Sequence, residues 1–168
     1  MPRIFSQYVK FVEAVNYRLG RIAMYGIFVM VGVLLWSSIS KTFFLPSLWT
    51  LEVAQFAMVA YYILGGPYSM QLGSNVRMDL FYSNWSDLKK SWVDSITVLF
   101  LIFFLGVLLY GGYDSTAYAF KYNERSATAW RPYMWPIKVV MCTGIFMMLL
   151  QATCELIKDI ARIRGVKL

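Results

Sequence analysis

Glu52 is the ionisable residue whose position points most directly to function, because it opens a long uncharged stretch. From Val53 to Val76 there are twenty-four residues without a charge. If a helix that starts near Leu48 crosses a bilayer here, Glu52 lies roughly 7 Å inside the outer end of that helix. An intramembrane carboxylate is costly and usually faces protein or water. Glu52 is therefore either a proton- or substrate-binding carboxylate or a buried anchor between helices.

The residues that follow Glu52 at helical spacing form one face of the same helix. They are Gln55, Val59, Tyr62, Gly66 and Ser69. This face is polar near Glu52 and small further along, which is the composition that membrane helices use to pack against one another. Because the sequence offers no second intramembrane carboxylate or cation for transport chemistry, we favour the structural anchor over the transport site.

Two further groups of residues combine charges with polar, aromatic or proline residues. In the first, Arg77 and Asp79 lie close together after the uncharged stretch. The second extends from Arg125 to Lys138 and also contains Ser126, Trp130, Pro132 and Pro136. Taken alone, the first is typical of a solvated loop pair that contributes little. The second is typical of an aromatic belt at a membrane surface with prolines that start a helix.

Several kinds of chemistry are excluded by what the sequence lacks. Histidine is absent, which excludes haem b ligation and makes proton relays and zinc sites based on histidine untenable. Cys142 and Cys154 lie twelve residues apart on one expected helix, or about 18 Å, which is too far for a disulfide. Because no nucleophile–base pair, phosphate loop or metal cluster is present, we expect no enzymatic activity, no cofactor and no metal.

The elements that position these residues are long apolar helices. Hydrophobic residues make up 59% of the 168-residue chain and charged residues 15%, against roughly 25% charged in soluble domains. Three more uncharged runs cover residues 22–40, 95–113 and 139–154. Because a helix needs about 20 apolar residues to cross the hydrocarbon core, the last run suffices only if Lys138 extends its ammonium group towards the headgroups.

We therefore expect an all-α integral membrane protein with a single membrane domain. Its four transmembrane helices are placed at about residues 19–40, 48–72, 91–113 and 133–155. Eleven of the sixteen Lys and Arg residues lie before or at the start of the first span, between the second and third, or after the fourth. This distribution puts both termini in the cytoplasm of a bacterium whose inner membrane the chain crosses. The net charge of +7 is then explained by contact with anionic lipid rather than by nucleic-acid binding.

The connecting segments carry their own signals. Residues 4–19 show apolar residues at helical spacing, which predicts an N-terminal amphipathic helix in the membrane interface or, about equally well, an extension of the first span. Ser47 is placed to cap the second helix. Pro67 predicts a bend in that helix. We expect a short helix on the membrane surface within residues 73–90, and a polar loop over residues 114–131.

Together these features resemble the small membrane subunit of tripartite ATP-independent periplasmic (TRAP) transporters, the DctQ-type family. The length, the four spans and the acidic Glu52 at the opening of the second span all fit. The string from Asn75 through Arg77 to Asp79 is similar to a family string that often begins with histidine. The stretch from Arg125 to Lys138 is similar to a second family motif, with one more residue between its two prolines.

The resemblance implies that the chain is a scaffold rather than a transporter of its own. Its partners would be a large multi-span membrane subunit with the substrate and sodium sites, a periplasmic solute-binding protein that delivers a carboxylate, and membrane lipids. The partner-interface candidates are Glu52, Gln55, Tyr62, Gly66, Ser69, Arg77, Asp79, Arg125, Ser126, Trp130, Pro132, Pro136 and Lys138. The alternative is a self-contained, proton-coupled drug antiporter that uses Glu52.

Overall fold

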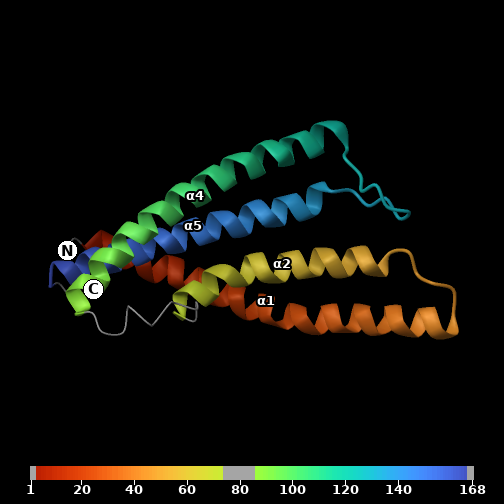
Figure 1. Cartoon of the computed structure of the whole chain (residues 1–168), viewed down its shortest axis with the longest axis horizontal. Helices are drawn as coiled ribbons and strands as arrows, with labels where there is room; N and C mark the ends of the chain where they lie inside the picture. Colours follow the sequence, from red (N-terminus) through yellow and green to blue (C-terminus); the bar gives the residue numbers. More distant parts are fainter. Residues whose placement is uncertain (1–2, 74–85, 166–168) are drawn as a thin grey trace.

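The computed structural model describes residues 3–73 and 86–165 as four α-helices (Figure 1). These are α1 (Arg3–Phe43), α2 (Thr50–Gln71), α4 (Asp87–Tyr122) and α5 (Trp135–Ile163). Both termini lie near one end of the molecule, here called the termini end. The α1–α2 and α4–α5 connections lie at the opposite end, here called the turn end. The chain is therefore built from two antiparallel helical hairpins.

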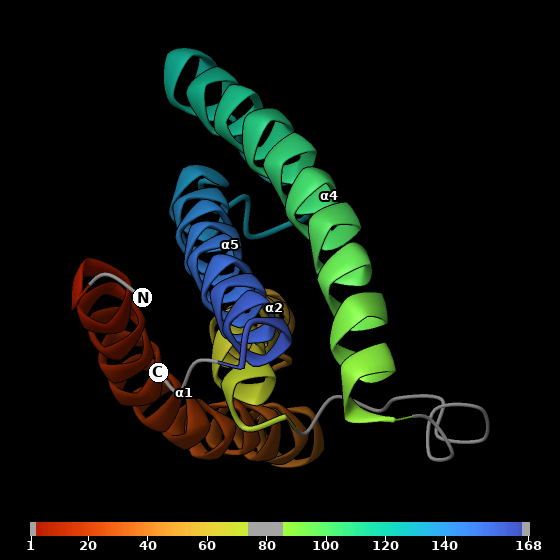
Figure 2. The same ribbon diagram turned by 90° about the vertical axis from the view of Figure 1, so that its left-hand side faces the viewer.

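The four helices form an open row rather than a closed bundle (Figure 2). α2 packs between α1 and α5, and α4 packs on α5. α1 also reaches α5, near the termini end, and the two hairpins diverge towards the turn end (Figure 1). As a result, many large apolar side chains of α1 and α4 remain exposed. Apolar surface on this scale suits lipid or another membrane protein rather than water.

Three of the described helices, α1, α4 and α5, are long and apolar enough to cross a membrane. α2 is not among them. Its 22 residues give a length of about 33 Å, which matches the hydrocarbon thickness of about 30 Å. Glu52 and Gln55, together with the Gly65–Gly66–Pro67 segment, keep the hydropathy of its longest apolar stretch below that of the three candidate spans. The all-α expectation is therefore confirmed, whereas composition alone supports three spans among the described residues.

The helix boundaries differ from the expected spans at both ends of the molecule, and α5 continues past residue 155 to Ile163. α2 agrees with the expected range of 48–72 to within two residues. α4 continues beyond residue 113 as far as Tyr122, so the first part of the expected polar loop is helical. It ends at Asn123, whose φ of 48° gives the left-handed conformation that closes many helices. Pro67 lies inside α2 without ending it.

α1 is one continuous helix of 41 residues, so the separate interfacial helix over residues 4–19 is wrong and the extension is right. The apolar stripe that suggested an interfacial helix packs on α5 instead. Val9 and Val12 form a buried cluster with Cys154, against which Tyr8, Leu150 and Ile157 pack. An amphipathic pattern indicates only that one face of a helix is shielded from water. In α1 this face is shielded by α5 rather than by lipid.

The turn between α1 and α2 corrects a second expectation. The residue that precedes α2 is Trp49, and no side chain caps the helix. Ser47 instead contacts the hydroxyl groups of Ser40, at 3.1 Å, and Thr50, at 3.0 Å. Thr50 in turn donates to Ser37 Oγ at 3.0 Å. These four hydroxyl groups satisfy one another, and so they tie the end of α1 to the start of α2.

Candidate functional site: the helix junction and the partner-facing surfaces

Close backbone packing joins the two hairpins. Gly144 of α5 lies so near α2 that a Cβ atom there would be 2.1 Å from Cγ2 of Ile63. Gly66 of α2 faces Met148, at 3.5 Å from the corresponding position to the sulfur atom. Small residues at these positions allow the helices to approach, as is common where membrane helices pack. Gly66, a candidate for a partner surface, therefore packs within the chain.

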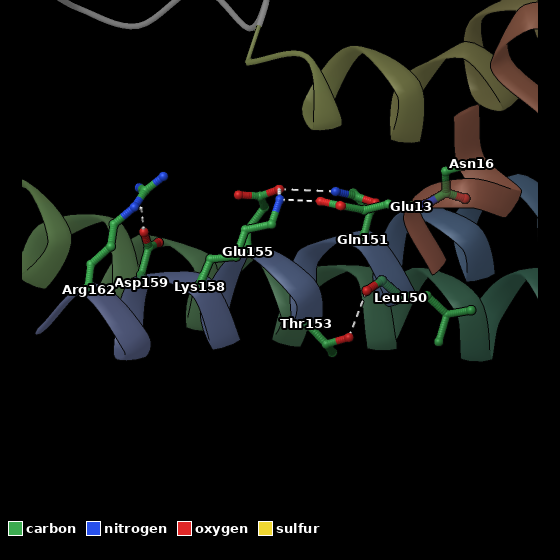
Figure 3. Close-up of polar contacts among 9 residues, drawn as sticks. All are labelled: Glu13, Asn16, Leu150, Gln151, Thr153, Glu155, Lys158, Asp159 and Arg162. Atoms are coloured by element: carbon green, nitrogen blue, oxygen red, sulfur yellow. Dashed lines mark hydrogen bonds and ion pairs between the residues drawn. The ribbon is translucent and has the colours of Figure 1, made fainter. Parts of the chain in front are cut away.

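A buried amide pair links α1 to α5 (Figure 3). Asn16 donates from Nδ2 to Oε1 of Gln151 at 2.8 Å, although the two residues are 135 positions apart. Both side chains are almost completely inaccessible to solvent. Gln151 then donates from Nε2 to Oε1 of Glu155 at 3.0 Å. Asn16 Oδ1 is buried without a partner among the described residues. The other amide groups are paired, as buried polar groups usually are, so this chain of bonds fixes the register of α1 against α5.

Ionic contacts continue the same junction towards the termini end (Figure 3). The Lys158 ammonium group bonds to Glu13 of α1 and, at 3.0 Å, to Glu155 of its own helix. Further along, Arg162 pairs with Asp159 at 3.2 Å. The side chains of Glu13, Glu155 and Lys158 are each about a quarter exposed. The Lys158 ammonium group compensates the charges of the two carboxylates, which partial burial would otherwise destabilise. The cluster therefore holds α1 against α5.

The connection between α4 and α5 is a folded loop rather than an open one. Arg125 and Tyr133 form a β-bridge. Two further backbone bonds close the loop, from Ser126 N to Pro132 O at 2.9 Å and from Met134 N to Glu124 O at 3.0 Å. The guanidinium group of Arg125 also lies over the Tyr133 ring, 4.4 Å from its centroid. This structure brings the predicted Arg125, Ser126 and Pro132 together at the turn end.

The same loop gives the other candidates different environments. Trp130 and Arg131 are exposed, and Arg131 has a positive φ of 50°. Pro136 is exposed in the first turn of α5. Lys138 is half-buried and pairs with Glu124 at 2.5 Å. The sequence did not point to Glu124, because a charged residue in a loop gives no indication of which helix residue its side chain will contact.

The residues of the α2 face that contains Glu52 differ in burial. Glu52 lies in the first turn, nearer the helix end than expected, and is only 5% exposed. Its Oε2 atom has no hydrogen-bond partner among the described residues. Gln55 and Tyr62 are exposed, whereas Ser69 is half-buried and has a partner. A carboxylate in the first turn is favoured by the partial positive charge of the helix start.

Part of the expected interface lies outside the described residues. Arg77 and Asp79 belong to this part, together with the helix expected within residues 73–90, of which residues 74–85 are not described.

The described residues contain no candidate metal cluster, and the groove between α4 and α5 lacks the features of a solute site. Among residues 3–73 and 86–165, no group of three His, Cys, Asp or Glu side chains could hold a metal ion. An open groove of about 590 Å³ lies between α4 and α5 and is lined mainly by apolar side chains, including Leu109, Tyr113 and Phe146. Small-molecule sites combine such a lining with convergent polar groups, and this groove offers little beyond Thr143 and Cys142.

Comparison with known families identifies the chain. A model of the tripartite ATP-independent periplasmic transporters, DctQ component, matches residues 30–162, which is most of the sequence. Comparisons with curated proteins and with solved structures returned no significant match. The family match and the long apolar helices agree with each other. The chain therefore belongs to the DctQ family, the small subunits of TRAP transporters.

Proposed function

We propose that this chain is the scaffold subunit of a TRAP transporter. It supports a large membrane subunit during sodium-coupled uptake of a carboxylate that a periplasmic binding protein delivers. The family match carries this proposal. The open row of helices supports it, because a row that leaves many apolar side chains uncovered is better suited to a partner than to enclosing a solute. Transport chemistry then belongs to the large subunit.

The proposal includes four membrane crossings in the bacterial inner membrane, with both termini in the cytoplasm. Four helices in two antiparallel hairpins bring the termini to one end, and Lys and Arg are concentrated in the segments at that end. Positive charge favours the cytoplasmic side. α2 crosses although it is not among the candidate spans, because α1 and α5 cover two of its sides. The turn end, with the folded α4–α5 loop, then faces the periplasm.

Co-purification tests the scaffold role. A tagged chain is co-expressed with the multi-span membrane protein encoded beside it, and the complex is extracted in mild detergent. We expect the two proteins to elute together in a fixed ratio. The role is contradicted if the chain always elutes alone. The antiporter alternative is supported instead if the purified chain, reconstituted without partners, moves a cationic drug along a pH gradient and Glu52→Gln abolishes that movement.

The folded loop is the part of the chain placed to contact the binding protein or the large subunit. Replacing Arg125 with Ala and Arg131 with Asn should lower solute uptake several-fold without lowering the amount of chain in the membrane. Asn is chosen at position 131 because it tolerates the positive φ there. Lys121→Ala, which removes an exposed cation from the last turn of α4, is the control. Normal uptake by the double variant would argue against this contact.

A further inference from the structure

The outward side of α2 carries polar groups in the part of the helix that would lie within the bilayer. Four exposed residues recur along it at spacings of four, three and four, which places them on one helical face. They are Leu51, Gln55, Met58 and Tyr62, here called the α2 stripe. The Gln55 amide and the Tyr62 hydroxyl group have no hydrogen-bond partner among the described residues. The stripe therefore has hydrogen-bonding capacity that the described part of its own chain leaves unused.

Of the two polar residues, Tyr62 gives the stronger evidence for a protein neighbour. It is 63% exposed and lies about 18 Å from the start of α2, roughly the middle of the helix. Tyrosines that face lipid gather at the two membrane surfaces, where their hydroxyl groups meet water or headgroups. At mid-depth, hydrocarbon offers no such partner and the exposed hydroxyl group would be costly. A protein neighbour that supplies an acceptor or a donor removes this cost.

The exposed faces of α1 and α4 provide the contrast. Phe28 of α1 is 72% exposed, and Phe103 of α4 is 73% exposed. Around them lie further apolar residues, such as Val29 and Phe100. These side chains need no hydrogen-bond partner and are compatible with lipid chains. The exposed tyrosines of the same two faces, Tyr25 and Tyr110, lie nearer the ends of the expected spans 19–40 and 91–113, where tyrosines that face lipid gather. α1 and α4 are also among the helices apolar enough to cross a membrane, whereas α2 is not.

We propose that the α2 stripe is the surface on which a transmembrane helix of the large membrane subunit packs. That helix would offer hydrogen bonds to Gln55 and Tyr62 and apolar contacts to Leu51 and Met58. This inference rests on the proposed function, which supplies the partner. Because α1 and α5 already cover two sides of α2, a helix on the stripe would cover the side of α2 that they leave exposed.

Site-specific photo-crosslinking tests the surface. The photoreactive residue benzoylphenylalanine replaces Tyr62 in the co-expressed complex, and it replaces Phe28 or Phe103 in matched controls that are equally aromatic and exposed. Recovery of the large subunit with the tagged chain is checked before irradiation. We expect the derivative at position 62 to give an adduct with the large subunit and the two controls to give none.

The other outcomes separate the two proposals. If the large subunit co-purifies but crosslinks only from position 28 or 103, the stripe is not the interface although the scaffold role stands. An adduct between two copies of this chain at position 62 likewise overturns the assignment. If no large subunit co-purifies with the unmodified chain, the proposed function fails first.

Removing only the polar groups gives a second measurement. Gln55→Leu and Tyr62→Phe each keep the apolar bulk and make α2 easier to insert into a membrane. Each should lower the affinity for the large subunit by roughly three- to tenfold, as expected for one interhelical hydrogen bond. Phe103→Leu is the control on a face assigned to lipid. Unchanged affinity in both stripe variants would contradict the proposed hydrogen bonds.

Discussion

Replacing Gly144 with Ala should force α2 and α5 apart and destabilise the purified chain. The added Cβ would lie 2.1 Å from Cγ2 of Ile63 and 3.1 Å from its backbone oxygen. A rotamer change of Ile63 could relieve the first contact, but the second involves the backbone and persists. Overpacking of this kind costs about 1–3 kcal/mol. Thermal unfolding in detergent, followed by circular dichroism, should show a melting temperature several degrees lower.

Two further variants isolate the steric cause. In Gly106→Ala, the new Cβ has no atom within 4 Å, and Ala is the better helix former by about 1 kcal/mol. This variant should therefore be at least as stable as the parent chain. Combining Gly144→Ala with Ile63→Ala removes the atom in closest contact and should recover part of the loss. Equal melting temperatures for Gly144→Ala and Gly106→Ala would show that the helices are not in close contact here.

The second large effect is expected at the buried amide pair. Asn16→Leu should destabilise the chain by about 1–3 kcal/mol, because the Oε1 atom of Gln151 loses its donor in a site without water access. Gln151→Met should have a similar cost, since it strands the Asn16 amide. The double variant replaces both groups with apolar side chains of similar size, which is often nearly neutral. Melting of the four proteins in detergent gives the coupling between the two residues.

The half-buried hydroxyl pair between the same two helices is the reference for this cycle. Tyr8 and Thr153 lie 2.9 Å apart but are less buried than the amide pair. Tyr8→Phe and Thr153→Val should therefore show weaker coupling than Asn16 and Gln151. Strictly additive losses at Asn16 and Gln151 would mean that the amide pair does not hold α1 against α5.

The helices and the family features could be predicted from the sequence. A helix in a membrane must satisfy its backbone hydrogen bonds within its own segment, so its existence follows from local composition. The uncharged run after Glu52 predicted α2 to within two residues of each end. The cluster between Arg125 and Lys138 was also visible as a motif, since its members lie within fourteen positions of one another.

The faces on which the helices meet were decided only by the tertiary structure. Asn16 and Gln151 come together across 135 positions, and the approach of Gly144 to Ile63 depends on how α5 is placed against α2. In a membrane protein, lipid-facing and protein-facing sides are both apolar, so hydropathy does not distinguish them. For the same reason, the sequence could place residues 4–19 on a membrane surface, whereas their apolar stripe packs on α5.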